Sequence, residues 1–217
     1  MSEAVVHADP LTVTGRLSQL GLTEAVLRES VQAGITSSLT CTRNHPRGFP
    51  GYLAWGEVTR SFRDRQVPQG WHVNNANGFE GTVSPGGDVK VVVESGDDAT
   101  GRQLQVPSAR NPKGMMTRTA IQNNQQAEFS DIVKDFPSLK KMPVRPGRTW
   151  LLLYYYDAPA QQIRLELSLP THLTRGGRIS SWQERVILKS MEIGTAVTVV
   201  TEESSTGDID VAVERRA

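Results

Sequence analysis

Hydrophobic residues recur at helical spacing in the first half of the chain, after about 21 weakly patterned residues. The first predicted helix has an apolar face made of Leu22, Val26, Leu27 and Val31. We expect Thr23 to be its N-cap and Gly34 to end it. A second helix is predicted by an apolar face made of Tyr52, Trp55, Val58 and Phe62. Pro68 and Gly70 are expected to stop that helix.

The middle of the chain predicts a β-hairpin and then a long helix. Segments 78–83 and 88–94 flank Ser84-Pro-Gly-Gly87, where proline and glycine supply the backbone angles of a tight turn. The long helix is predicted from Thr117 to Phe136, with Pro137 after its last residue. Its apolar side consists of Ile121, Phe129, Ile132, Val133 and Phe136.

The last third of the chain favours antiparallel β structure. A strand over 148–157 leads through a turn into a second strand, in which alternate positions are hydrophobic. Residues 178–189 fit a strand or a short helix, and 196–201 with 209–213 predict a closing hairpin. The predicted fold class is therefore α+β: N-terminal helices, a β-hairpin and one long central helix packed on a mainly antiparallel C-terminal sheet. Strand counting gives about five strands in that sheet.

The segment 137–147 is rich in proline and lysine and is the best candidate for a linker. It separates a helix, hairpin and helix region over 1–136 from a β region over 148–217. At 217 residues the chain is long enough for one core or two small ones. We expect the two regions to form one compact unit.

The net charge of +1 indicates no partner, but the charges are distributed unevenly. Residues 102–148 hold nine basic and three acidic side chains, a local charge of +6, so the rest of the chain carries −5. Such separation favours one electropositive face on an otherwise acidic body. The alternative is that these charges point in different directions once the chain is folded.

The basic loop, residues 102–118, is the strongest candidate site because it contains no acid and runs into the start of the long predicted helix. Free backbone N–H groups and positive charge at a helix start suit an anion. The candidate ligand-binding residues are Arg102, Arg110, Lys113, Arg118, Asn123 and Asn124. They favour a binding module for nucleic acid or a nucleotide-like phosphorylated ligand. The alternative is a solvated loop followed by an ordinary exposed helix face.

A second hypothesis is a metal-dependent phosphodiesterase or nuclease. Asp97 and Asp98 follow an apolar strand and could hold a divalent metal, although Gly-Asp-Asp also suits a simple turn. The residues of this hypothesis are the carboxylates Asp88, Glu94, Asp97 and Asp98 and the lysines Lys90 and Lys113. Asp88-Val-Lys90, with Glu80 upstream, is a nuclease-like triplet that also arises by chance. No P-loop, zinc-site or hydrolase motif is present, so no enzyme class and no other cofactor are indicated.

A third hypothesis is a protein-interaction subunit or a homo-oligomer that uses the strand Trp150–Tyr156 or the helix Tyr52–Phe62. An exposed tyrosine of that strand could instead stack on a base.

The single cysteine and the absence of a signal peptide favour the cytoplasm. No apolar run approaches the ~20 residues of a membrane span, so we expect no membrane partner. The polar loops 42–51 and 95–113 are the usual kind of place for function.

Overall fold

One mixed β-sheet runs through the computed structural model, which describes residues 4–133 and 147–193. Along the sheet the order is β1-β7-β6-β5-β4-β3-β2, and β8 pairs with the start of β6. The strands are β1 (Val5–His7), β2 (His72–Asn74), β3 (Gly81–Val83), β4 (Val89–Ser95), β5 (Arg148–Asp157), β6 (Gln162–Leu173), β7 (Ile179–Ile187) and β8 (Met191–Glu192). The α+β fold class predicted from the sequence is confirmed.

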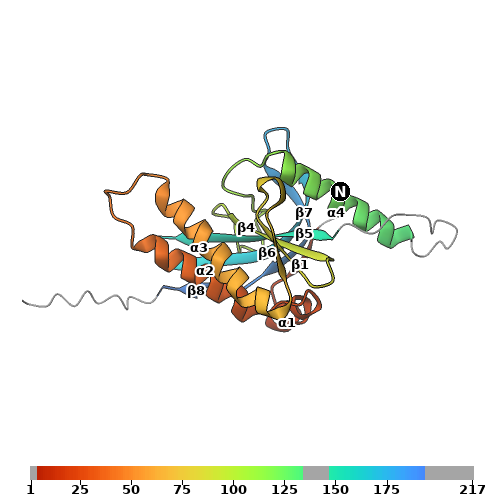
Figure 1. The fold of residues 1–217 in the computed structure, drawn as a ribbon, viewed down its shortest axis with the longest axis horizontal. Helices are drawn as coiled ribbons and strands as arrows, with labels where there is room; N and C mark the ends of the chain where they lie inside the picture. Colours follow the sequence, from red (N-terminus) through yellow and green to blue (C-terminus); the bar gives the residue numbers. More distant parts are fainter. Residues whose placement is uncertain (1–3, 134–146, 194–217) are drawn as a thin grey trace, which may run out of the picture.

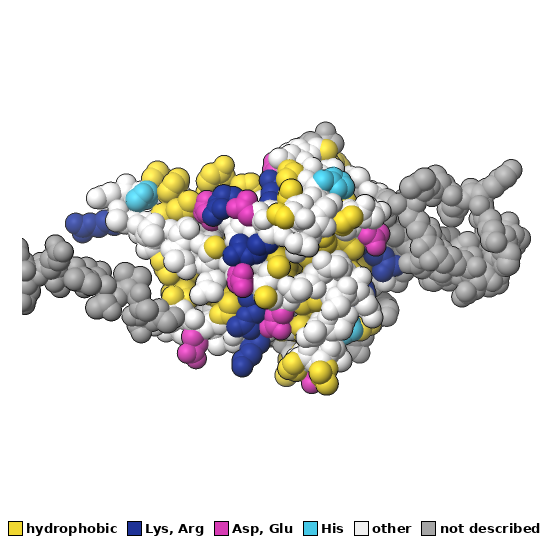
Figure 2. All heavy atoms as spheres, turned by 60° about the horizontal axis from the view of Figure 1, so that its bottom comes forward, with side chains coloured by type: hydrophobic (Ala, Val, Ile, Leu, Met, Phe, Trp, Pro, Cys, Tyr) yellow, Lys and Arg dark blue, Asp and Glu magenta, His cyan; other side chains and the backbone are white. Residues whose placement is uncertain are grey.

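Helices cover both faces of this sheet (Figure 1). The helices are α1 (Pro10–Gln19), α2 (Glu24–Leu39), α3 (Phe49–Gln66) and α4 (Met115–Val133), with 3₁₀ turns at Val67–Gln69 and Ala76–Gly78. The first three helices pack on one face and α4 packs on the other. In the middle of the view in Figure 2, basic side chains lie next to acidic ones. On α3, Arg60 forms ion pairs with Glu57 and Asp64. No helix of the described residues has the length and hydrophobicity needed to cross a bilayer.

Most strand pairs are antiparallel, but two are parallel: β1 with β7, and β4 with β5. The β4–β5 pair is parallel because α4 carries the chain back across the sheet between the two strands. The hairpin predicted in the middle of the chain is therefore part of the same sheet as the C-terminal strands. This crossover, and the short strands β1 and β2, account for the difference between about five predicted antiparallel strands and the mixed sheet observed.

The centre of the sheet is buried on both faces. In β5, Trp150, Leu152 and Tyr154 face the layer of α1–α3, while Leu151 and Leu153 face the side of α4. Trp150 is fully buried and Tyr154 is 4% exposed. Residues 150–154 are therefore core and do not form an exposed apolar surface, which was one of the two surfaces that the protein-interaction hypothesis offered.

Several local predictions are confirmed and others are wrong. The strand over 148–157, the hairpin around 84–87 and the Thr23 N-cap are observed, and 178–189 is a strand rather than a helix. Thr117 is not an N-cap, because α4 begins two residues earlier and buries this side chain. The predicted linker, up to residue 146, and the predicted closing hairpin lie outside the described residues.

Gly34 does not end the second helix, which continues to Leu39. It lies where α2 meets α3, and a Cβ at this position would come within 2.3 Å of the Val58 side chain and 2.5 Å of the Ala54 carbonyl oxygen. The glycine is therefore required by the close approach of two helices rather than by a helix end. This contact sets how closely α3 packs against α2.

We expect Gly34→Ala to destabilise the protein by about 1–3 kcal/mol, since the added methyl group would force the two helices apart. Chemical denaturation would measure this change. The matched control is Gly56→Ala in α3, where a Cβ meets nothing within 4 Å. That variant should be neutral or more stable by up to about 1 kcal/mol. Equal stability of the two variants would contradict the assigned role of Gly34.

Candidate functional site

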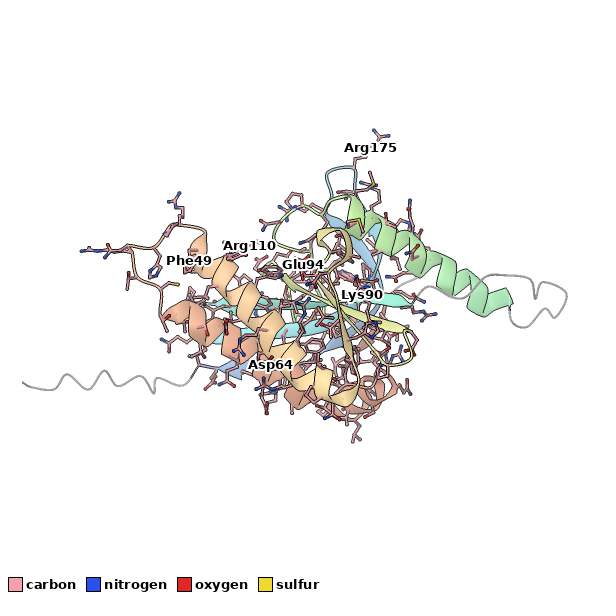
Figure 3. The ribbon with its side chains drawn as sticks, in the orientation of Figure 1. Phe49, Asp64, Lys90, Glu94, Arg110 and Arg175 are labelled. Atoms are coloured by element: carbon pink, nitrogen blue, oxygen red, sulfur yellow. The ribbon has the colours of Figure 1, made fainter. Side chains whose placement is uncertain are left out.

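A cleft of about 650 Å³ opens where the start of α3, the end of β4 and the basic loop meet. It lies at the carboxyl end of β4, a strand of the parallel pair, which is a common place for a ligand in α/β sheets. Figure 3 shows Phe49, Arg110 and Glu94 along this side of the molecule. The charged residues that line the cleft are Arg47, Glu80, Glu94, Arg110 and Lys113.

Three of these five charged residues are in ion pairs: Lys113 and Glu94 pair with each other, and Glu80 pairs with Arg63, which does not line the cleft. Lys113 Nζ lies 2.5 Å from Glu94 Oε2, and Arg63 Nη2 lies 3.1 Å from Glu80 Oε2. Arg47 and Arg110 are exposed and form no ion pair within the described part of the chain. The cleft therefore presents two uncompensated guanidinium groups, which is the condition for attracting an anion.

The backbone of the basic loop is held firmly at the point where Arg110 enters the cleft. The Arg110 N–H donates to the Ser95 carbonyl oxygen at 2.8 Å, which extends the sheet beyond β4. Arg178 Nη1 donates to the carbonyl oxygens of Ala109 and Arg110, both at 3.0 Å. These hydrogen bonds hold the Arg110 backbone in place, so its side chain extends from a fixed point at the edge of the cleft.

The wall opposite the basic loop is aromatic. Trp55 is half-buried and its indole N–H donates to the Val93 carbonyl oxygen at 3.2 Å, which orients the ring. The Tyr52 ring lies 5.6 Å from it, centroid to centroid, and is 68% exposed. The first turn of α3 adjoins these rings, and its N-cap, Gly48, supplies no side chain to cap it. This wall therefore contributes one exposed ring, that of Tyr52, to the cleft.

Tyr154, on β5, is the strand partner of Ser95 at the end of β4. Ser95 Oγ lies 3.2 Å from the Tyr154 hydroxyl, and burial raises the pKa of this phenol above its usual value. Tyr154 is therefore a neutral hydrogen-bonding group at physiological pH and adds no charge to the site.

The structure brings together only two of the six ligand-binding residues predicted from the sequence, Arg110 and Lys113. Arg102, Arg118 and Asn123 do not line the cleft. Asn124 is 1% exposed and its amide joins α4 to the sheet. Its Nδ2 donates to the carbonyl oxygens of Thr149 and Pro170 at 3.0 and 3.2 Å, and its Oδ1 accepts from the Thr149 N–H at 2.7 Å. The polar groups of Asn124 are thus used within the fold.

The two aspartates proposed as metal ligands do not line the cleft either. The Asp97 carboxylate accepts hydrogen bonds from the backbone N–H groups of Ser108 at 2.9 Å and Ala99 at 3.3 Å. It therefore folds the loop, and Asp98 is exposed. Among the described residues, no group of three or more histidine, cysteine, aspartate or glutamate side chains is arranged to hold a metal ion.

The nuclease-like triplet has a structural role as well. Ser84 Oγ donates to Asp88 at 2.6 Å within the hairpin turn. Lys90 Nζ lies 4.6 Å from the centroid of the Phe79 ring and donates to Asn74 Oδ1 at 3.2 Å. Burial lowers the pKa of Lys90. The triplet stabilises the hairpin beside the cleft rather than lining it.

Sequence reasoning missed Arg47 and the aromatic wall as site residues. The available signal was the polar loop 42–51, rich in turn-forming residues, which ends at the start of α3. Nothing in local sequence relates this loop, residues 42–51, to the basic loop that begins at residue 102. Their meeting depends on the packing of α3 against β4.

We expect Asn124→Ala to destabilise the protein by about 1–3 kcal/mol, because it leaves buried backbone groups of β5 and β6 without partners. The neighbouring substitution Asn123→Ala, at a half-buried position with no hydrogen bond among the described residues, should change the free energy of unfolding little. Urea denaturation would compare the two. Asn124→Ala stability equal to that of the wild type would overturn the structural role of this amide.

Comparisons of the chain with protein-family models, with curated proteins and with solved structures find no significant match. The distinguishing features of the cleft are two arginines without an ion-pair partner among the described residues, an exposed ring, and two carboxylates, of which Glu94 is paired with Lys113 and Glu80 with Arg63.

Proposed function

We propose that the cleft binds a phosphorylated, nucleotide-like group, either free or within a nucleic-acid strand. The observation that carries this proposal is that Arg47 and Arg110, from distant segments, line one cleft without an ion-pair partner among the described residues. Arginine presents a planar fork of donors that matches phosphate oxygens. Tyr52 adds an exposed ring on which a base can stack.

In this proposal Arg110 makes the main contact with the phosphate group, whereas Lys113 acts through its ion pair with Glu94. Since Lys113 is paired with Glu94, its charge is already balanced and it mainly shields the ligand from that carboxylate. Removal of Lys113 would leave Glu94 as an unpaired negative charge at the cleft. We therefore expect Lys113→Ala to weaken binding through repulsion as well as through the loss of a cation.

We expect Arg110→Ala to weaken binding of thymidine monophosphate and of a single-stranded oligonucleotide by about tenfold or more, the effect of losing one charge-assisted hydrogen bond. For the oligonucleotide, the slope of log affinity against log salt concentration should become shallower by about 0.7, the contribution of one single-strand phosphate contact. Isothermal titration calorimetry would measure the first effect and fluorescence anisotropy the second.

Arg175→Ala is the matched control. Arg175 lies on the loop between β6 and β7, is exposed and does not line the cleft (Figure 3). The two variants lose the same charge, so a general effect of net charge would weaken binding equally in both. The proposal fails if neither ligand binds the wild-type protein at low salt, or if both variants bind alike.

A second candidate function is metal-dependent cleavage of a phosphodiester. It is favoured because Glu80 and Glu94 both line the cleft, with the Lys113 ammonium 2.5 Å from Glu94. Mg²⁺ is commonly bound by one or two carboxylates, water and the phosphate of the substrate, so two protein ligands suffice. In this candidate the carboxylates hold the metal and Lys113 stabilises the charge that develops on the phosphate.

This second function predicts Mg²⁺- or Mn²⁺-dependent cleavage of an oligonucleotide, which Glu94→Gln should reduce at least a hundredfold by removing a metal ligand. Asp98→Asn is the control, because Asp98 is exposed and does not line the cleft. Gel electrophoresis of labelled DNA and RNA would follow the reaction. Absence of cleavage with both metals leaves the binding function alone, and equal loss in both variants would contradict the assignment of Glu94.

Two expectations from the sequence remain proposals. The half-buried thiol Cys41 is a free cysteine, which fits the cytoplasmic location proposed for this protein. A protein partner, if present, would contact the exposed side chains of α3 rather than the buried strand β5.

A further inference from the structure

We infer that the ligand path continues from the cleft over the turn between α2 and α3, residues 40–48, and that the ligand is a single-stranded nucleic acid. This inference rests on the proposed function of the cleft, since it extends the same site. It adds a surface that shares Arg47 and Tyr52 with the cleft and extends beyond it to Arg43 and His45, and it selects a strand over a free nucleotide. We call residues 40–48, together with Phe49 and Tyr52, the tip surface.

The tip surface is positively charged and carries no acid. No aspartate or glutamate occurs between Glu29 and Glu57 in the sequence. Arg43 and Arg47 are exposed, and neither forms an ion pair with another described residue. Arg47 belongs both to this surface and to the cleft, so the two positive regions are continuous. A polyanion can therefore pass from one to the other without meeting a negative charge on the turn.

The same surface carries a row of exposed rings. His45 stacks on Phe49 with ring centroids 5.3 Å apart and planes inclined by 10°. Tyr52 follows three residues after Phe49 on α3, about 4.5 Å further along the helix axis. Figure 2 shows this end of the molecule, at the left, with a histidine among hydrophobic side chains and a basic side chain beside them. Rings interleaved with arginines match the recognition of unpaired bases and their phosphates.

The turn is ordered by its own hydrogen bonds. The Thr42 N–H donates to His45 Nδ1 at 3.0 Å, and the His45 N–H donates to the Thr42 carbonyl oxygen at 3.0 Å. The Phe49 N–H donates to the Pro46 carbonyl oxygen at 2.9 Å, which joins the turn to the first turn of α3. The rings are thus positioned before any ligand arrives, so little conformational entropy is lost on binding.

The combination of rings and charge selects among the polyanions. In a duplex the bases are stacked on one another and their faces are not available to protein rings. An acidic peptide would satisfy the arginines but would offer no base to stack on the exposed His45, Phe49 and Tyr52 side chains. A single strand satisfies both kinds of group.

The test compares ligands and variants of the full-length protein. Fluorescence anisotropy would measure binding of single-stranded oligothymidylate of about twelve nucleotides, its RNA equivalent and a duplex of the same length. Calorimetry would measure binding of thymidine monophosphate. The variants are Arg43→Ala and Tyr52→Ala on the tip surface, with Tyr52→Phe as the conservative control and Arg175→Ala as the charge control. The three side chains that these variants change are exposed, so each variant should fold.

We expect the single strand to bind at least tenfold more tightly than thymidine monophosphate. Tyr52→Ala should weaken strand binding about tenfold, by loss of one stacked base, and Tyr52→Phe should restore most of it. Arg43→Ala should reduce the salt slope by about 0.7, the contribution of one single-strand phosphate contact. It should leave binding of thymidine monophosphate unchanged, because Arg43 does not line the cleft.

The inference is overturned if Arg43→Ala and Tyr52→Ala bind the oligonucleotide like the wild type, or if the strand binds no more tightly than the mononucleotide. In either case, Arg110-dependent binding of the mononucleotide would still support the proposed function of the cleft. Equal affinity for the duplex, or equally effective competition by a polyglutamate peptide, would also overturn it. Preference between DNA and RNA would identify the kind of strand.

Discussion

The buried ion pair between Glu166 and Arg185 determines the course of the loop that forms one wall of the cleft. Glu166 is fully buried and Arg185 is 3% exposed, and their closest N–O distance is 2.6 Å. A buried pair is tolerated only if its remaining hydrogen-bonding capacity is used. Here the carboxylate also accepts from Ser168 Oγ and the Gly101 N–H, while the guanidinium donates to the carbonyl oxygens of Arg102 and Gln105. The pair is thus satisfied largely by the backbone of the basic loop.

This arrangement links the stability of the sheet to the position of the site. Beyond Gln105, the Trp182 indole N–H donates to the Pro107 carbonyl oxygen at 3.0 Å, and Arg178 donates to the carbonyl oxygens of Ala109 and Arg110. Three side chains of the β7 region therefore direct the loop across the sheet until Arg110 and Lys113 reach the end of β4. A loop that looks solvated in composition is fixed by buried donors, and only some of its own side chains remain free for a ligand.

Much of the fold could be predicted from the sequence because it depends on local patterns. The strand over 148–157, the proline–glycine hairpin and the Thr23 cap each follow from residues within a few positions of one another. The parallel pairing of β4 with β5 could not be predicted, since periodicity shows that a strand exists but not which strand lies beside it. Gly34 was misread for the same reason: its role depends on Val58 and Ala54 of another helix.

The candidate site was only partly predictable, and charge explains why. The +6 of residues 102–148 suggested that local charge density would mark the site. In the folded chain Lys113 is neutralised by Glu94, and the free positive charge of the cleft comes instead from Arg110 together with Arg47. The local charge summed along the sequence includes every charged side chain. Ligand binding depends only on the charges that have no ion-pair partner after folding. Asn124 shows the same limit for polar groups, because an amide that seems available for bases is used by the backbone of β5 and β6. A side chain can therefore bind a ligand only if the folded protein does not already engage it in hydrogen bonds or ion pairs.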